Sequence, residues 1–271
     1  MRTMPISFVI ILSVVTCTGI ASASSLKAGD TLTYTMTSHT SISGGNLPAQ
    51  AYKPQPNVVT TFTMEIKAVD ADGTAHVHVK RHREPPPGMV AWQVAAFEKL
   101  ANADCDVALT KYGALLATVD DSYQSSQASA KPDSMSLGQY RDQIVAQAND
   151  PRYRANEAAR EVKGDFVAGN AVALSIAKRK SFAPGDGWKA IVDGATYDVK
   201  VTGKAPFGGH DTTVFDVKSD TEFQSGSTTT DATVYYDVTM QRIVGIHSAS
   251  HTKIQITGME NSTTSDFVLQ Q

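Results

Sequence analysis

Alternating apolar and polar residues predict β-strands in the first third of the chain. In "TLTYTMTS", Leu32, Tyr34 and Met36 fall on one face and threonines fall on the other. This period of two is typical of a half-buried strand. Two further alternating runs, in "VVTTFTMEIKAVDADGTAHVHVKR", flank an Asp-Ala-Asp-Gly sequence at residues 70–73 that favours a turn. We therefore expect a strand followed by a hairpin between residues 31 and 83.

A second set of alternating runs lies near the C-terminus, and its segments match those of the first set in order. "LKAGDTLTYTM" matches "FAPGDGWKAIV", and "GTAHVHVKR" matches "HDTTVFDVKSD". "DVALTKYGALLAT" matches "VYYDVTMQRIVGIHSAS". Repeated order of this kind indicates an internal duplication.

The middle of the chain favours helices. Residues 88–104 carry apolar residues at helical spacing after three prolines, which predicts a helix near 89–103. "SLGQYRDQIVAQAN" predicts another helix, and Asp150 followed by Pro151 is typical of the start of a third. Residues 120–134 have the composition of a linker.

These patterns predict an α+β fold with two similar antiparallel β-sheet halves, as a curved sheet or half-barrel, and helices from the middle of the chain packed on them. The expected boundaries are 24–119 for the first half, 120–180 for a linker and helical connector, and 181–271 for the second half. The patterns leave open whether the halves form one barrel or two sheets.

Residues 1–23 are expected to be a signal peptide. Arg2 precedes an apolar stretch at residues 6–15, and Ala21-Ser22-Ala23 fits a cleavage site. We therefore expect an exported protein, in the periplasm or outside the cell. No later run is apolar enough over the ~20 residues that a spanning helix needs, so we expect no transmembrane segment in the mature chain. Lipoprotein anchoring through Cys17 is not favoured, because Thr16 is a poor match to a lipobox.

Charge and cysteine content restrict the expected class of protein and its partners further. The full chain has a formal net charge of −3, and its lysines and arginines are scattered. No broad basic face is therefore expected, and nucleic acid is not an expected partner. Removal of residues 1–23 would leave Cys105 as the single cysteine, so no internal disulfide is expected and stability must come from a packed core.

Two pairs of histidines are the candidate metal ligands. His76 and His78 alternate with Val77 and Val79 on one predicted strand. On another, His247 and His251 share the face opposite to that of the apolar positions 244, 246, 254 and 256. If the duplication places these strands at corresponding positions, the pairs could converge on one metal ion. The same alternation equally describes solvated strand faces, and a lysine on each face would repel a cation. No metal site is favoured, and no cofactor is expected.

Two common signatures of catalytic sites are missing from the sequence. It contains no G-x-S-x-G elbow and no phosphate-binding loop. Cys105 lies between Asp104 and Asp106, and two adjacent negative charges disfavour a thiolate. We therefore do not expect an enzyme.

Gly185, Asp186 and Trp188 begin the second set of strands, and residues 29–32 repeat the Gly-Asp start in the first. With the antiparallel strands and helical inserts, this pattern resembles uncharacterised exported bacterial envelope proteins with duplicated antiparallel sheets. At the level of architecture it is similar to LolA/LolB-like half-barrels. The resemblance implies a curved sheet that cradles lipid on its concave side, and it transfers no functional residues.

The function expected from the sequence is that of a non-enzymatic binding or carrier module of the bacterial cell envelope. Its ligand, an apolar small molecule or lipid, would lie on a concave apolar sheet face. A structural or assembly protein with an envelope partner is the first alternative. A metal-dependent enzyme that uses the paired histidines is the second. The sequence identifies no ligand-binding residue.

Overall fold

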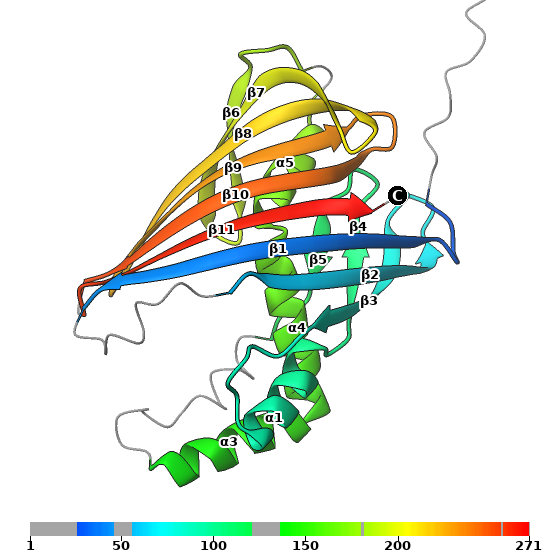
Figure 1. The fold of residues 1–271 in the computed structure, drawn as a ribbon. Coiled ribbons are helices and arrows are strands. Elements are labelled where there is room, and N and C mark those ends of the chain that lie inside the picture. The colour runs from blue at the N-terminus through cyan, green and yellow to red at the C-terminus, as the bar shows by residue number, and fades with distance from the viewer. Residues whose placement is uncertain (1–25, 46–55, 121–135, 180–181, 256, 271) are drawn as a thin grey trace, which may run out of the picture.

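The computed structural model describes residues 26–45, 56–120, 136–179, 182–255 and 257–270. The predicted signal peptide with Cys17, and nearly all of the predicted linker, lie outside these residues. The described residues form one antiparallel sheet of eleven strands in the order β5-β4-β3-β2-β1-β11-β10-β9-β8-β7-β6 (Figure 1). The strands are β1 (Thr31–Gly44), β2 (Val58–Val69), β3 (Ala75–Arg83), β4 (Cys105–Leu109), β5 (Leu115–Ala117), β6 (Gly187–Val192), β7 (Ala195–Phe207), β8 (His210–Phe223), β9 (Gly226–Asp237), β10 (Arg242–Ile254) and β11 (Met259–Gln270).

The two sets of strands join into a single open sheet. Strands β1 to β5 follow one another as neighbours, and so do β6 to β10. Strand β11 lies between β1 and β10 and pairs with both. The predicted α+β class with a curved antiparallel sheet is therefore confirmed, and the open question about the halves is answered by one continuous sheet.

Both halves begin with the same turn. The N–H of Gly29 donates to the carbonyl of Ile66 at 2.9 Å, and the N–H of Gly185 donates to the carbonyl of Val201 at 2.8 Å. The two glycines have φ of 92° and 95°, a region that L side chains rarely adopt. A β-bulge directly follows Ile66 in one half and Val201 in the other. These matched contacts support the duplication indicated by the sequence.

Four helices among the described residues complete the fold: α1 (Ala91–Ala101), α3 (Leu137–Asn149), α4 (Pro151–Asp165) and α5 (Val167–Ile176). The predicted start of α4 is confirmed, because the Asp150 carboxylate accepts from the N–H of Arg152 at 2.8 Å and Pro151 is the first helical residue. None of these helices is long and apolar enough to cross a membrane. Helix α5 was not predicted.

Helix α5 occupies the concave side of the sheet (Figure 1). A Cβ on its Gly169 would lie 2.5 Å from Cδ1 of Ile243, so the helix and β10 approach as closely as a glycine allows. The buried Asn170 side chain accepts from the N–H of Leu115 and donates to its carbonyl, both at 2.8 Å, as a neighbouring strand would. Because α5 carries almost no polar surface, burial against the sheet is its stable position.

Phe166, between α4 and α5, marks the centre of the core. Its ring lies edge-on to the rings of Tyr34, Phe62 and Phe267, with centroid distances of 5.6, 6.2 and 4.3 Å. Edge-to-face packing at these distances is favourable beyond the area that it buries. The cluster joins the connector helices to β1, β2 and β11, where the two halves of the sheet meet.

Candidate functional site

The apolar part of the inner sheet face, where the sequence predicted a ligand, is covered by the protein's own helix. Phe215, Val234 and Ile246 are buried on this face, and α5 packs against the strands that carry them. Among the described residues, no open apolar cradle remains at this place, and beyond α5 most inner-face side chains are polar.

Five strands continue beyond α5 and form what we call the arm: residues 38–44 of β1, 219–223 of β8, 226–230 of β9, 248–254 of β10 and 259–265 of β11. In Figure 1 the arm is the tapering end of the sheet, and no described helix lies against it. Side chains on its inner face are mostly half-buried, whereas most on its outer face are exposed.

The inner face of the arm is an array of hydroxyl groups in register. Three rows run across the strands and are spaced by about 7 Å along each strand, with neighbours about 4.8 Å apart. From the core outward, the rows are Ser248, Ser265 and Ser38; then Ser219, Thr230, Ser250, Thr263 and Thr40; then Thr221, Thr228, Thr252 and Asn261.

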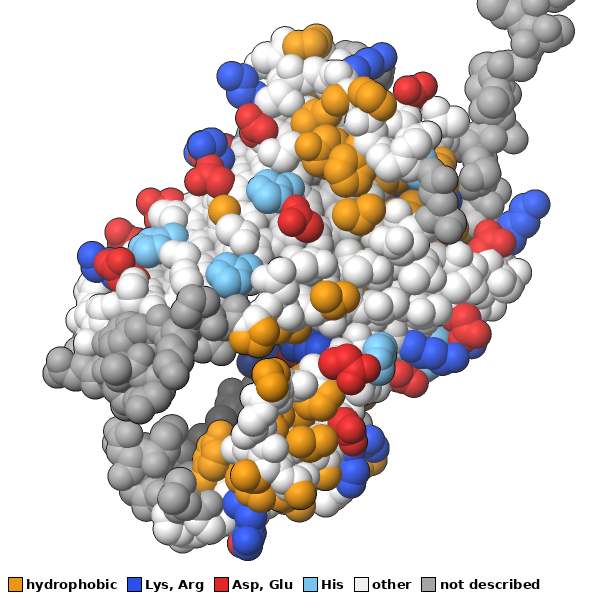
Figure 2. Space-filling model, viewed as in Figure 1, with side chains coloured by type: hydrophobic (Ala, Val, Ile, Leu, Met, Phe, Trp, Pro, Cys, Tyr) orange, Lys and Arg blue, Asp and Glu red, His pale blue; other side chains and the backbone are white. Residues whose placement is uncertain are grey.

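The two faces of the arm differ in the charge of their side chains. No inner-face position carries Lys, Arg, Asp, Glu or His. On the outer face, Lys253 pairs with Glu260 at 3.3 Å, and His251 hydrogen-bonds to Ser262 at 2.9 Å. Figure 2 shows histidines and charged side chains over this outer face. The outer face is thus a solvated surface, and the inner face is neutral.

An aromatic residue closes the array at the tip. Phe223 of β8 is directly opposite Gly226 of β9 and is 43% exposed. A Cβ on Gly226 would meet Cζ of Phe223 at 3.1 Å, so the ring lies over this glycine. Ile254 and Met259 continue the same row on β10 and β11. The tip therefore adds an apolar row next to the outermost row of hydroxyls, with Phe223 as its exposed member.

Hydrogen-bonding capacity remains within the array. Thr228 shares a hydroxyl–hydroxyl bond of 2.9 Å with Thr252, and Thr40 shares one of 3.1 Å with Thr263. Oδ1 of Asn261 is buried and has no hydrogen-bond partner among the described residues. A buried acceptor without a partner is costly, and each hydroxyl can donate once and accept twice. The inner face can therefore take further donors and acceptors.

The structure does not bring the candidate metal ligands together. His76 and His78 lie on β3, and His247 and His251 lie on β10, with β2, β1 and β11 between them. At the usual strand spacing this separates the pairs by roughly 19 Å. The expectation that the pairs occupy corresponding strands is wrong, because β3 corresponds to β8 and β10 corresponds to β5 in strand order.

Each pair instead contacts partners on or beside its own strands. His76 Nε2 lies 2.9 Å from Asp70, and His78 Nδ1 lies 2.8 Å from Asp106. On β10, His247 Nδ1 lies 2.5 Å from Asp266. Within the described part of the chain, no group of three or more His, Cys, Asp or Glu side chains is placed to hold a metal ion.

Cys105 lies at the start of β4 and is buried. The pKa of its thiol is raised to about 11, mainly by burial, which Arg81 opposes and which Asp106 and Asp104 reinforce. The side chain is therefore a thiol at neutral pH, which makes it a poor nucleophile.

A buried charged cluster joins the connector helices to β3. The Arg81 side chain is fully buried and pairs with Glu161 of α4, and Arg83 lies 3.7 Å from the same carboxylate. At the end of α4, burial raises the pKa of Asp165 to about 6, although Arg81 and Arg83 oppose the shift. Because Arg81 and Arg83 both pair with Glu161 across the interface, these ion pairs fasten α4 to the sheet.

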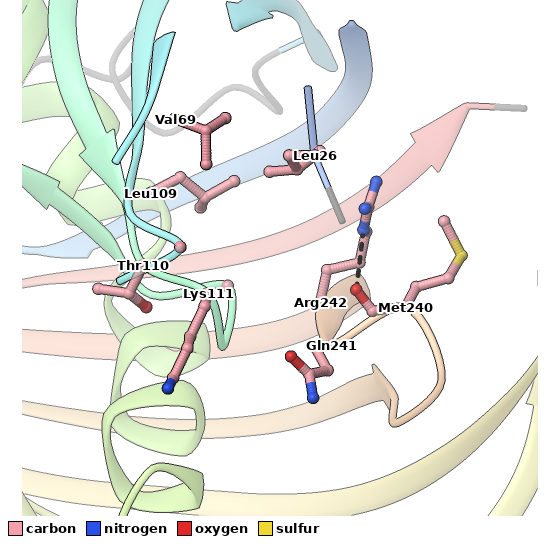
Figure 3. Close-up of a pocket in the computed structure, with 10 residues that line it drawn as sticks. Leu26, Val69, Leu109, Thr110, Lys111, Met240, Gln241 and Arg242 are labelled. Carbon is pink, nitrogen blue, oxygen red and sulfur yellow. Dashed lines mark hydrogen bonds between the residues drawn. The ribbon is translucent and has the colours of Figure 1, made fainter. Parts of the chain in front are cut away.

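A small pocket lies at the end of the sheet opposite the arm (Figure 3). The turn between β4 and β5 meets the turn between β9 and β10 there, since a Cβ on Gly113 would lie 3.0 Å from Cα of Arg242. Leu26, Val69 and Leu109 line its apolar side. Its volume of about 100 Å³ is below the ~300 Å³ of small ligand sites, so we interpret it as the seam between two turns.

Sequence reasoning missed the arm, although a signal for it was present. Along β10, the inner-face positions run from Ile246 through Ser248, Ser250 and Thr252 to Ile254. Hydroxyl residues thus hold positions that the period of two assigns to the core. Such an interruption, repeated on neighbouring strands, marks a sheet face that no apolar element covers.

Comparisons with known proteins place the chain in no family. No family model matches it, and no curated protein matches it. Among the matches to solved structures is one described as "Lipid-protein interactions in lipovitellin", with 8% sequence identity and a TM-score of 0.43, over 91% of this chain and 25% of that one. The chain therefore spans about a quarter of the length of the solved chain that it matches.

Proposed function

We propose that this protein is an exported, non-enzymatic binding module of the bacterial cell envelope, and that it holds its ligand on the inner face of the arm. The observation that carries the proposal is the contrast between the two ends of the inner face. One end is buried under α5, and the other presents ordered polar groups that no described helix covers. Export is proposed from the signal-peptide pattern of residues 1–23.

The chemistry of the arm favours binding over catalysis. Its inner face offers hydroxyls and the Asn261 amide, with no titratable side chain among them. General acid–base catalysis needs a positioned titratable group, and a hydroxyl nucleophile needs an adjacent base. Fixed donors and acceptors on rigid strands instead suit the recognition of a ligand by shape and hydrogen bonding.

Cysteine labelling on the two faces of one strand tests this function. Ser250→Cys places a thiol on the inner face of β10, and Ala249→Cys places one on the outer face, next to it in sequence. Cys105 contributes little background because it is buried. With an extract of bacterial envelopes added to the purified mature protein, we expect maleimide labelling of Ser250→Cys to slow several-fold and that of Ala249→Cys to stay unchanged.

Equal labelling rates for Ser250→Cys with and without the extract would contradict the function. Slowing at both positions would also contradict it, because a ligand on the inner face leaves the outer face open.

A further inference from the structure

We infer that the ligand of the arm is a neutral glycan chain, bound across the strands with one sugar stacked on Phe223. This inference rests on the proposed function and specifies the chemical class of its ligand. It uses three features of the inner face: its lack of charge, its rows of hydroxyls and its exposed aromatic tip.

The lack of charge selects a neutral ligand. Phosphate groups of lipids and nucleic acids are bound in proteins mainly through Arg, Lys and helix N-termini, and the inner face of the arm has none of these. An acyl chain would need a long open apolar surface. Helix α5 covers the apolar part of the inner face, and beyond it the tip offers only Phe223, Ile254 and Met259 in one row. The inner face therefore fits a polar ligand without ionised groups.

The hydroxyl rows select a ligand that both donates and accepts along its whole length. The outermost row places Thr221, Thr228, Thr252 and Asn261 on four adjacent strands. Hydroxyl groups can serve as donor or acceptor, which matches the hydroxyls of a sugar. The unpartnered Oδ1 of Asn261 adds a buried acceptor in the same row. A sugar hydroxyl that donates to this atom would remove the cost of leaving it unpaired.

Phe223 supplies an apolar contact, which hydroxyl groups cannot. Sugar rings have an apolar face of C–H groups, which packs against the face of an aromatic ring. The Phe223 ring is exposed beside Thr221 and Thr228, and the absence of a side chain at Gly226 lets it lie over the strand. An aromatic platform next to a row of hydrogen-bonding groups is thus formed without any movement of the backbone.

Rigid strands hold these groups in place. From β8 to β1 the array spans four strand-to-strand steps, roughly 19 Å at the usual spacing. Several consecutive sugars of an extended chain can therefore contact the array together. Many weak hydrogen bonds along one linear ligand give binding that increases with chain length.

Calorimetric titration with neutral hexasaccharides tests the inference. The probes are cellohexaose, maltohexaose and chitohexaose, added to the purified mature protein, with phosphatidylcholine vesicles as a separate probe. We expect at least one hexasaccharide to bind saturably and its trisaccharide to bind more weakly. Phe223→Ala is expected to weaken binding by about tenfold, since it removes one aromatic contact. Thr228→Val is expected to weaken binding as well.

Thr229→Val is the matched control, because Thr229 is the next residue on β9 and faces outward. Its affinity should equal that of the unchanged protein, and circular dichroism confirms the folding of all three variants. Equal losses in Thr228→Val and Thr229→Val would overturn the placement on the inner face.

The outcomes also separate this inference from the function on which it rests. If no hexasaccharide binds while the envelope extract still protects Ser250→Cys, the glycan inference is overturned and the binding function stands. Binding of vesicles without binding of hexasaccharides overturns the inference in favour of a lipid. If the extract gives no protection and no hexasaccharide binds, both proposals fail.

Discussion

The same strands form two different inner faces along their length. On β10, Ile246 and Ser250 point to the same side of the sheet, but Ile246 is buried under α5 and Ser250 lies in the open arm. The apolar period thus continues only as far as another element covers it. Beyond that point, threonine and serine hold most inner-face positions and keep the strands extended. The difference shows that α5 covers the apolar part of these strands and that hydroxyl residues replace apolar ones beyond it.

The largest effect is expected from truncating a side chain in the core. Phe166→Ala removes the ring that packs on Tyr34, Phe62 and Phe267, and we expect it to lower the free energy of unfolding by about 3–5 kcal/mol. Thr263→Val, on the inner face of the arm, should change it by less than about 1 kcal/mol. Urea denaturation measures both values. Similar losses from the two substitutions would mean that the arm is part of the core.

A smaller effect is expected from the contact that holds α5 to the sheet edge. Asn170→Ala leaves the buried N–H and carbonyl of Leu115 without their partner, at an expected cost of about 2–3 kcal/mol in the free energy of unfolding. Asn156 makes the same two bonds to the backbone of Asp120, at 2.7 and 3.0 Å, near the surface. Asn156→Ala should cost under about 1 kcal/mol. Equal costs in thermal unfolding would argue against a buried, fixed α5.

At the charged cluster, the size of the expected effect depends on pH. Burial raises the folded-state pKa of Asp165 to about 6, above the ~3.9 of an unfolded chain. The contribution of Asp165 to stability is therefore present at low pH and is lost as pH rises from about 4 through 6. We expect Asp165→Asn to leave stability nearly unchanged at pH 4 and to raise it by roughly 2–3 kcal/mol at pH 8.

Exposed Asp142 on α3 provides the control for this substitution. Asp142→Asn should give the same small change in melting temperature at pH 4 and pH 8. A destabilised Asp165→Asn variant at pH 8 would show that the carboxylate is needed as an ion-pair partner for Arg81 or Arg83.

Much of the sheet could be predicted because its signals are local. The alternation of Leu32, Tyr34 and Met36 predicted the inner face of β1, and Asp150 with Pro151 predicted the start of α4. Helix α5 gave no comparable signal. Its residues are small and apolar on every side, so no stripe of a helical period stands out from the background. For that reason the expected ligand surface was placed where α5 lies.

Prediction of the candidate site from the sequence was limited in the same way. The period of two places the histidines of each pair on one face of their strand. The distance between the two pairs depends on the order of the strands in the sheet, which no local pattern contains. Asn261 and Thr252 become neighbours only through the register of β11 on β10. The alternation along single strands assigns faces, whereas the array across strands needs pairings between residues far apart in sequence.

By itself, the sequence determined the local elements of this protein: where strands alternate, where turns reverse the chain, where α4 begins and how the two halves repeat. These follow from the conformational preferences of neighbouring residues. Only the tertiary structure decided that β11 joins the halves, that α5 covers the apolar inner face, and that the hydroxyl rows align beyond α5. Those outcomes depend on which distant surfaces bury one another, because burial of apolar area is a property of the whole packed chain.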